Sequence, residues 1–151
     1  MSGIVVGVDG SESARAALRF ALAEAAVRDA PVRAVTGWHL PAGASGNVYA
    51  PPPPNLEEEL EAEALRMLEQ AIAAAGHEDV DVEAVVREGQ PAQVLVAEAQ
   101  DADLLVVGSR GLGGFRGLLL GSVSQQCAHH APCPLVIVPH EQDLPAHGGD
   151  A

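Results

Sequence analysis

The amino-acid sequence predicts an α/β fold, a doubly wound five-stranded parallel sheet between two layers of helices. Short runs rich in Val, Ile and Leu alternate with longer segments whose apolar residues recur at helical spacing. The first run is apolar throughout, which is typical of a strand buried on both faces. Because each crossover helix returns the chain in the same direction, the strands are expected to be parallel. The runs are residues 4–8, 32–38, 80–86, 104–107 and 135–138.

The 151 residues are most simply one domain, large enough to bury a core without disulfide bonds. We expect this domain to span residues 1–139. The remaining residues, 140–151, are polar and contain Gly and Pro, so we expect a flexible C-terminal tail.

The first predicted strand stops at the turn-forming triplet Asp9-Gly10-Ser11. A helix follows, and Asp9 or Ser11 is expected to cap it. Pro31 ends this segment, and residues 32–38 read as the second strand. The buried face of the helix is formed by Ala14, Ala17, Leu18, Ala21, Leu22 and Ala25.

A long loop, residues 39–55, follows the second strand and contains four consecutive prolines. A loop of this length in a compact domain is either functional or disordered. Asn55 is expected to cap the second helix, with Glu58 three residues on, and Gly76 to end it.

The third strand is predicted over residues 80–86, because apolar and polar side chains alternate there. This pattern places the strand near an edge of the sheet, with one face exposed. The inward residues are expected to be Val80, Val82, Ala84 and Val86, and the outward ones Asp81, Glu83 and Val85.

The last third of the chain supplies two more helices and two strands. Gly89 and Pro91 turn the chain into a helix that bears Val94 and Leu95, and residues 104–107 form the fourth strand. Residues 122–130 are expected to form a short helix that Pro132 breaks, before the fifth strand.

Composition excludes several classes of function. The net charge is −13, which disfavours binding to nucleic acid and to anionic membranes. All eight basic residues are arginines, so neither a Walker-type phosphate lysine nor a Schiff-base lysine exists. No signal peptide and no apolar run of about 20 residues is recognisable. With only two cysteines, the expected setting is the reducing cytoplasm.

Residues 106–124 have the outline of an anion-binding loop. They join the end of a strand to the start of a helix and contain six glycines. Glycine lets the backbone approach a ligand closely, and the following helix directs unpaired N–H groups and the positive end of its dipole towards it. Arg110 and Arg116 lie in the loop, either as phosphate partners or as solvated side chains.

Three segments are expected to meet at this loop. Ligands of open parallel sheets bind outside the carboxyl ends of the strands. Asp9, residues 37–54 and the glycine loop all follow such ends, and should therefore converge.

These residues resemble a known family, the ATP-binding universal stress proteins. The resemblance rests on the motif Gly108-x-x-Gly111, followed after nine residues by Gly121-Ser122. Similar segments cover nearly the whole chain: residues 6–11, 88–92, 102–111 and 133–138.

The resemblance implies a flavodoxin-like, Rossmann-like sheet with strand order 3-2-1-4-5 and a homodimer formed through the fifth strand. It implies an adenine nucleotide as ligand, ATP or else ADP, AMP or cyclic AMP, with Mg²⁺ as a companion of the phosphates. The implied function is that of a dimeric sensor or regulator in the stress response, whose protein partner is unknown.

The resemblance also implies the nucleotide-binding residues. Ribose and phosphate contacts fall to Gly108, Gly111, Gly121 and Ser122, with Val123 and Ser124 in the same helical turn. Asp9 would contact the nucleoside, the backbone of Gly37 the adenine edge, and Gly7 and Val107 the pocket wall.

Simpler interpretations remain beside these. Asp9 is also suited to a helix cap or an Asx-turn, and the glycine loop to a flexible connector. Cys127, His129, His130 and Cys133 invite a metal site, but a core thiol and exposed histidines are favoured.

No catalytic constellation is apparent in the sequence. A weak ATPase or phosphotransferase using Asp9 and Mg²⁺ is one alternative function. A dimerisation module with a vestigial pocket, binding no nucleotide, is another.

Overall fold

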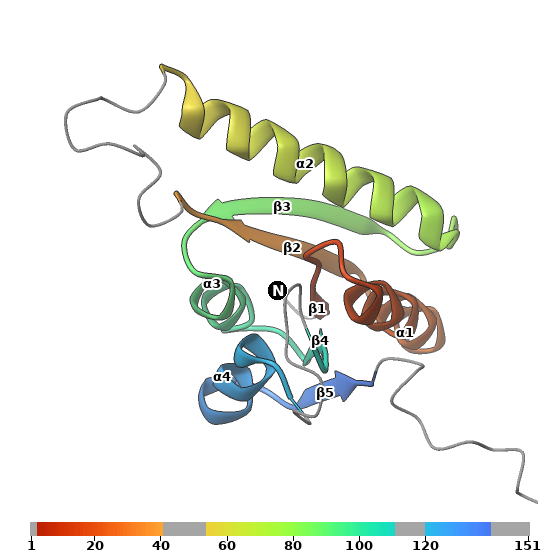
Figure 1. The fold of residues 1–151 in the computed structure, drawn as a ribbon. Coiled ribbons are helices and arrows are strands. Elements are labelled where there is room, and N and C mark those ends of the chain that lie inside the picture. The colour runs from red at the N-terminus through yellow and green to blue at the C-terminus, as the bar shows by residue number, and fades with distance from the viewer. Residues whose placement is uncertain (1–2, 41–53, 111–119, 140–151) are drawn as a thin grey trace, which may run out of the picture.

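The computed structural model describes residues 3–40, 54–110 and 120–139, which form alternating strands and helices (Figure 1). The elements are β1 (Ile4–Gly7), α1 (Glu12–Arg28), β2 (Val32–Trp38), α2 (Leu56–Ala75), β3 (Val82–Glu88), α3 (Pro91–Glu98), β4 (Leu104–Gly108), α4 (Ser122–His130) and β5 (Leu135–Val138). Residues 41–53 of the predicted long loop and residues 140–151 of the predicted tail lie outside this described part of the chain.

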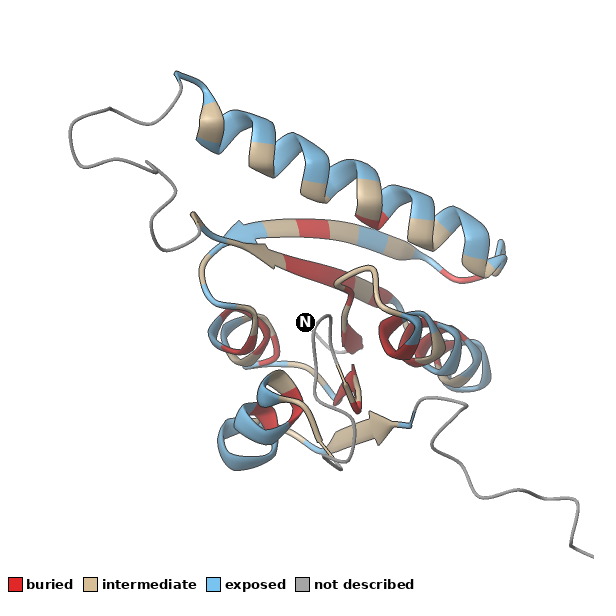
Figure 2. Ribbon diagram, viewed as in Figure 1, coloured by how far each residue is buried: buried red, intermediate tan, exposed pale blue. Residues whose placement is uncertain are grey.

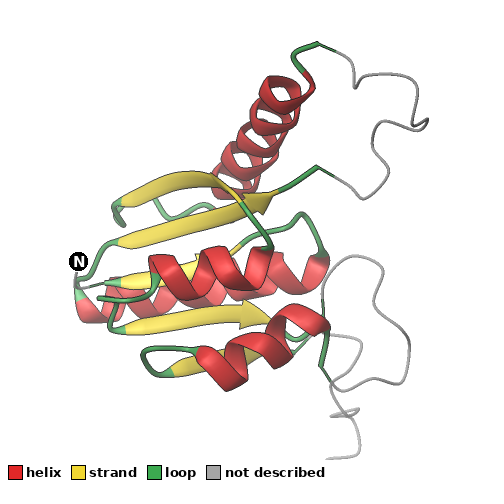
Figure 3. Ribbon diagram, turned by 90° about the vertical axis from the view of Figure 1, so that its left-hand side faces the viewer, coloured by secondary structure: helices red, strands yellow, loops and turns green. Residues whose placement is uncertain are grey.

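The strands form one parallel sheet in the order β3-β2-β1-β4-β5. Turning the molecule by 90° shows the strands all pointing the same way, with helices packed along them (Figure 3). The predicted fold class and strand order are therefore confirmed.

Side chains alternate between two cores, one on each face of the sheet. Ile4 and Val6 of β1 join the core under α1 and α2, whereas Val5 joins the core under α3 and α4. The central strands are buried on both sides, while most of α2 is exposed (Figure 2). This explains why the central strands are continuous apolar runs in the sequence.

Most element boundaries agree with the sequence prediction. The bounds of β2, α4 and β5 are those expected. β1 ends one residue early, at Gly7, although the N–H of Val8 still donates to the carbonyl of Val35 at 2.9 Å.

The third strand differs from its prediction on one face. β3 spans Val82–Glu88, two residues later than the predicted 80–86. It pairs only with β2 among the described strands, so the edge position is confirmed. Val85, expected to point outwards with Glu83, is only 4% exposed. It packs in the core that contains Val94 and Leu95 of α3, whereas Glu83 and Arg87 on the same face of the strand are exposed.

The second helix begins and ends where expected, but its predicted cap is wrong. Asn55 occupies the N-cap position with a left-handed backbone, φ 70°, and its side chain makes no capping hydrogen bond. A capping side chain reaches the first-turn N–H groups from an extended backbone, which Asn55 does not adopt. Gly76, with φ 77°, ends the helix as predicted.

Candidate functional site

The carboxyl ends of β1, β2 and β4 lie side by side and enclose a cavity of about 70 Å³. Seven of the ten residues implied by the resemblance line it: Gly7, Asp9, Gly37, Val107, Gly108, Val123 and Ser124. Gly121 and Ser122 lie directly beside them at the start of α4, while Gly111 is outside the described residues. Asp9 and Gly37 therefore converge, as expected, with the two described ends of the glycine loop.

The remaining lining residues are not among those ten. They are Val8, Ala14, Val35, Pro91, Leu95 and Arg110. One of them, Arg110, is a candidate phosphate partner from the sequence, and the other candidate, Arg116, lies outside the described residues. Val8 and Val35 follow from strand order, since each lies near the carboxyl end of its strand. Ala14, Pro91 and Leu95 come from α1 and α3, and only the packing of these helices on the sheet brings them here.

Gly108 is required by the close approach of a helix. A Cβ atom at this position would lie 2.6 Å from the carbonyl carbon of Ser13 and 2.7 Å from its Oγ. Contacts this short cannot be accommodated without moving α1. The glycine therefore lets the first turn of α1 sit against the end of β4.

Gly37 is constrained in a similar way by the turn before α3. A Cβ atom there would lie 3.1 Å from both the carbonyl oxygen of Gly89 and the Cα of Pro91. The absence of a side chain keeps the backbone of β2 accessible at the edge of the cavity. Glycine is therefore favoured at position 37 both by the packing of the turn before α3 and by the accessibility of the β2 backbone from the cavity.

Asp9 forms an Asx-turn. Its Oδ1 accepts a hydrogen bond from the N–H of Ser11 at 2.9 Å. The helix cap is Ser11, whose Oγ accepts from the N–H of Ala14 at 3.1 Å. Within the described residues, Oδ2 of Asp9 has no hydrogen-bond partner, so this oxygen can accept a bond from a ligand hydroxyl.

Hydrogen bonds hold the two ends of the glycine loop together. The N–H of Gly121 donates to the carbonyl of Ser109 at 2.7 Å. The hydroxyl of Ser124, which is buried, lies 3.0 Å from that same carbonyl and 3.0 Å from the carbonyl of Gly121. In this structure the Ser124 hydroxyl therefore positions the loop ends, and the cavity receives mainly the backbone of this turn.

A buried serine pair fixes α1 to the same place. The Oγ atoms of Ser13 and Ser109 are 3.5 Å apart, and the N–H of Arg110 donates to Oγ of Ser13 at 3.3 Å. Neither serine was predicted as part of the site. Ser13 is distant in sequence from the loop, so only the tertiary contact could identify it.

The start of α4 is the most polar backbone facing this region. Gly121 is its N-cap residue, with an extended backbone, and no side chain of the described residues forms a capping hydrogen bond there. The first N–H groups of an α-helix have no partner within the helix and carry the positive end of its dipole. Because Val123 and Ser124 line the cavity, this positive end faces it.

The thiols of the C-terminal region are buried or half-buried, whereas its imidazole groups are exposed. Burial raises the pKa of the Cys127 thiol to about 11, so it stays protonated at neutral pH. Burial, and secondarily the Asp103 carboxylate, also raise the pKa of Cys133. His129 and His130 are exposed. Among the described residues, no three His, Cys, Asp or Glu side chains are grouped as a metal site would require.

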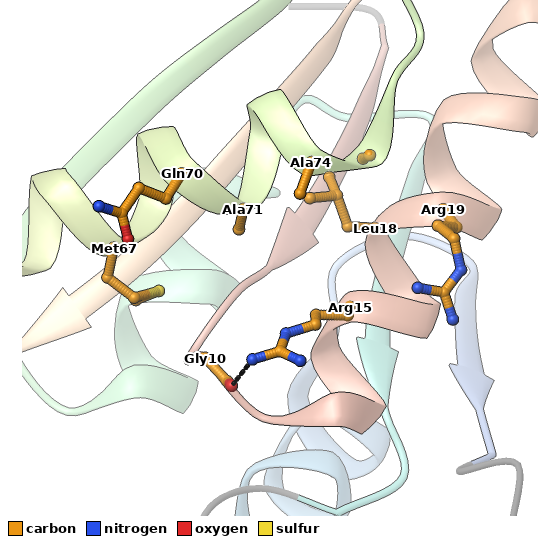
Figure 4. Close-up of a pocket in the computed structure, with 9 residues that line it drawn as sticks. Gly10, Arg15, Leu18, Arg19, Met67, Gln70, Ala71 and Ala74 are labelled. Atoms are coloured by element: carbon orange, nitrogen blue, oxygen red, sulfur yellow. Dashed lines mark hydrogen bonds between the residues drawn. The ribbon is translucent and has the colours of Figure 1, made fainter.

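A second and larger cavity lies elsewhere, in a groove between α1 and α2 with a volume of about 350 Å³ (Figure 4). It shares no lining residue with the cavity at the carboxyl ends. If volume were the only criterion, this groove would be the candidate functional site. The convergence of three strand ends and an uncapped helix selects the smaller cavity as the candidate site.

None of the helices in the described residues is both long enough and apolar enough to cross a membrane.

Comparisons with known proteins agree with the fold and identify the family. Residues 1–139 match the model of the universal stress protein family. A universal stress protein of Mycolicibacterium smegmatis is 34% identical over 154 residues, which cover 96% of this chain and 50% of that protein. The chain thus spans about half the length of this relative.

Two solved structures are also similar. One is a universal stress protein in complex with cAMP, with 31% identity and a TM-score of 0.64, covering 93% of this chain and 98% of that one. The other is the universal stress protein from Archaeoglobus fulgidus in complex with dAMP, with 26% identity and a TM-score of 0.61, covering 91% and 98%.

Proposed function

Because the chain belongs to the universal stress protein family, we propose that it binds an adenine nucleotide, with ATP as the first candidate, at the carboxyl edge of its sheet. The observation that carries this proposal is the uncapped start of α4, which faces the same cavity as Asp9 and Gly37. Oriented N–H groups at a helix start bind phosphate without any lysine. The cAMP and dAMP complexes of similar proteins support an adenine ligand.

The roles of the residues follow from their chemistry. The N–H groups of Ser122, Val123 and Ser124 bind phosphate oxygens, and the Ser122 hydroxyl, on an exposed residue, adds a further donor. Oδ2 of Asp9 accepts a hydrogen bond from a ribose hydroxyl.

The adenine ring is assigned to the apolar part of the cavity, beside the backbone of Gly37. Val35, Leu95 and Val107 form the walls there. At about 70 Å³ the cavity is smaller than the roughly 300–1,000 Å³ typical of ligand pockets. The cavity therefore takes one part of the nucleotide, and the phosphates lie along the start of α4. Mg²⁺ is expected to arrive with the phosphates.

The biological role that we propose is regulation by a homodimer in the cytoplasm. β5 pairs only with β4 among the described strands, and its four residues, Leu135–Val138, are all half-buried apolar side chains. An unpaired apolar edge of this kind favours pairing with a second copy. Light scattering should give twice the mass of one chain, and a monomer at micromolar concentration would refute this part of the proposal.

Nucleotide binding can be tested with two variants of one residue. Gly121→Asn adds a neutral cap to α4, whereas Gly121→Asp adds a cap of similar shape with a negative charge. We expect isothermal titration with ATP to give saturable binding for the wild type, weaker binding for Gly121→Asn, and at least another tenfold loss, or about 1.4 kcal/mol, for Gly121→Asp.

Trp38, the single tryptophan, provides a second readout of this experiment. It follows Gly37 in β2, and its buried Nε1 has no hydrogen-bond partner among the described residues. Its fluorescence should change on addition of ATP. Unaltered fluorescence with no heat of binding, or equal affinities in the wild type and Gly121→Asp, would refute the proposed site. Phosphate released during the titration would instead favour the ATPase alternative.

A further inference from the structure

The groove between α1 and α2 has the size of a ligand site. Its volume of about 350 Å³ lies within the roughly 300–1,000 Å³ of small-molecule pockets. Helix α1 forms one wall and α2 the other, and Gly10 closes one end (Figure 4).

Apolar side chains form the floor of the groove and the wall on α2. Leu18 is 1% exposed, and Met67, Ala71 and Ala75 are half-buried against the same core. Ala74 lies above them on α2 and is exposed. The small alanine side chains leave the volume open, since larger ones would fill it.

Two arginines form the wall on α1. Arg15 and Arg19 lie one turn apart, so both guanidinium groups can reach one ligand. Arg15 makes only a long hydrogen bond, 3.4 Å from its Nη2 to the carbonyl of Gly10 (Figure 4). Neither arginine forms an ion pair within the described residues, and no acidic residue lines the groove.

Other arginines of this acidic chain do have carboxylate partners. Arg28 pairs with Glu24 at 2.9 Å, and Arg33 and Arg87 each pair with Glu98 at 3.0 Å. Arg66 on α2 likewise has no ion pair among the described residues, so what distinguishes Arg15 and Arg19 is their position beside an apolar hollow. Their charge complements an anion that also has an apolar part.

We propose that this groove binds a small amphipathic anion, a carboxylate or phosphate monoester on a short hydrocarbon body. The guanidinium groups of Arg15 and Arg19 hold the oxyanion, because arginine donates paired hydrogen bonds to both kinds of group. The hydrocarbon body lies against Leu18, Met67 and the alanines of α2. This site is separate from the one proposed for nucleotide, since the two cavities share no lining residue.

The chain offers a specific probe for this site. Its only methionines are Met1 and Met67, so protein labelled with ¹³C at the methionine methyl groups gives one signal from the groove. We expect octanoate or octyl phosphate to shift the Met67 signal saturably, and the tighter of the two identifies the headgroup. Octylamine, with the same body and opposite charge, and acetate, with no body, should leave it in place.

Variants separate a specific site from adsorption. R15Q combined with R19Q should weaken binding at least tenfold, and Ala74→Leu, at an exposed position, should fill the groove and abolish binding. Arg28→Gln, on the same helix outside the groove, is the matched control and should bind like the wild type. An unmoved Met67 signal in the wild type, an equal response to octylamine, or undiminished binding in the double variant would overturn the proposal.

Discussion

Helices α1 and α4 both begin at the carboxyl edge of the sheet, but they begin differently. α1 starts at Ser11, whose hydroxyl caps the first turn, and Glu12 adds a negative charge there. α4 starts at Gly121, with no capping side chain and no acidic residue in its first turn. α1 buries seven of its residues, whereas α4 buries only Ser124 and Cys127.

Under the proposed function, this difference distinguishes a helix that supports the fold, α1, from a helix that binds the ligand, α4. The Ser11 hydroxyl accepts the N–H of Ala14 at the start of α1, and the long buried face of this helix supports the sheet. In the proposed site, the first N–H groups of α4, a helix with a small buried face, bind the phosphates of the ligand. A bound phosphate would supply the cap that the sequence omits.

The largest effect is expected where the start of α1 packs against the end of β4. In Gly108→Ala the new methyl group would collide with the backbone of Ser13 at the start of α1. We expect a loss of about 1–3 kcal/mol in the free energy of unfolding, as for an overpacked core, and weakened ATP binding because the edge of the cavity moves. Urea denaturation and calorimetric titration measure the two effects. A fully stable variant would mean that α1 lies further from β4 than described.

The second prediction tests how α4 is held. The folded-state pKa of Cys127 is raised from 9.0 to about 11, so its stabilising contribution is complete below pH 9 and is lost as the pH rises towards 11. The free energy of unfolding should fall by roughly 2–3 kcal/mol over that interval.

Cys127→Ala provides the comparison for this pH dependence. The variant is expected to be less stable at neutral pH, because a buried side chain is shortened, but it should lack this alkaline decline. An identical decline in both proteins would show that another group is responsible.

The smallest effect is expected at the cap of α1. Ser11→Ala removes the hydrogen bond to the N–H of Ala14 and should lower stability by about 1 kcal/mol. ATP affinity should be unchanged, because this cap belongs to the structural helix. Thermal unfolding and titration on the same sample would check both, and a loss of affinity comparable to that of Gly121→Asp would abolish the distinction between the two helices.

Much of the fold could be predicted from the sequence, because nearby proline and glycine residues set several boundaries of the helices and strands. Pro31 precedes β2, Gly121 precedes α4, and Pro132 follows α4, so the predicted bounds of both elements are correct. The errors arose where local rules depend on tertiary structure. The left-handed backbone of Asn55 and the burial of Val85 under α3 leave no trace in their own segments.

Some residues of the candidate site could likewise be predicted from the sequence, and others could not. Asp9, Gly37 and Val107 could be placed together because they follow neighbouring parallel strands. Ser13 and Leu95 could not, because they reach the cavity through helix packing. The groove between α1 and α2 was also missed, since Arg15 and Met67 belong to separate helices whose facing surfaces only the assembled fold defines.

The most direct test of this account is the amide NMR spectrum of ¹⁵N-labelled protein titrated with ATP. The largest shifts should come from Ser122, Val123 and Ser124, with smaller shifts at Asp9 and Gly37. The amide of Ala14, already bonded to Ser11, should move less than any of the three in α4. Shifts centred on the groove at Arg15 and Met67, or an unchanged first turn of α4, would contradict the account.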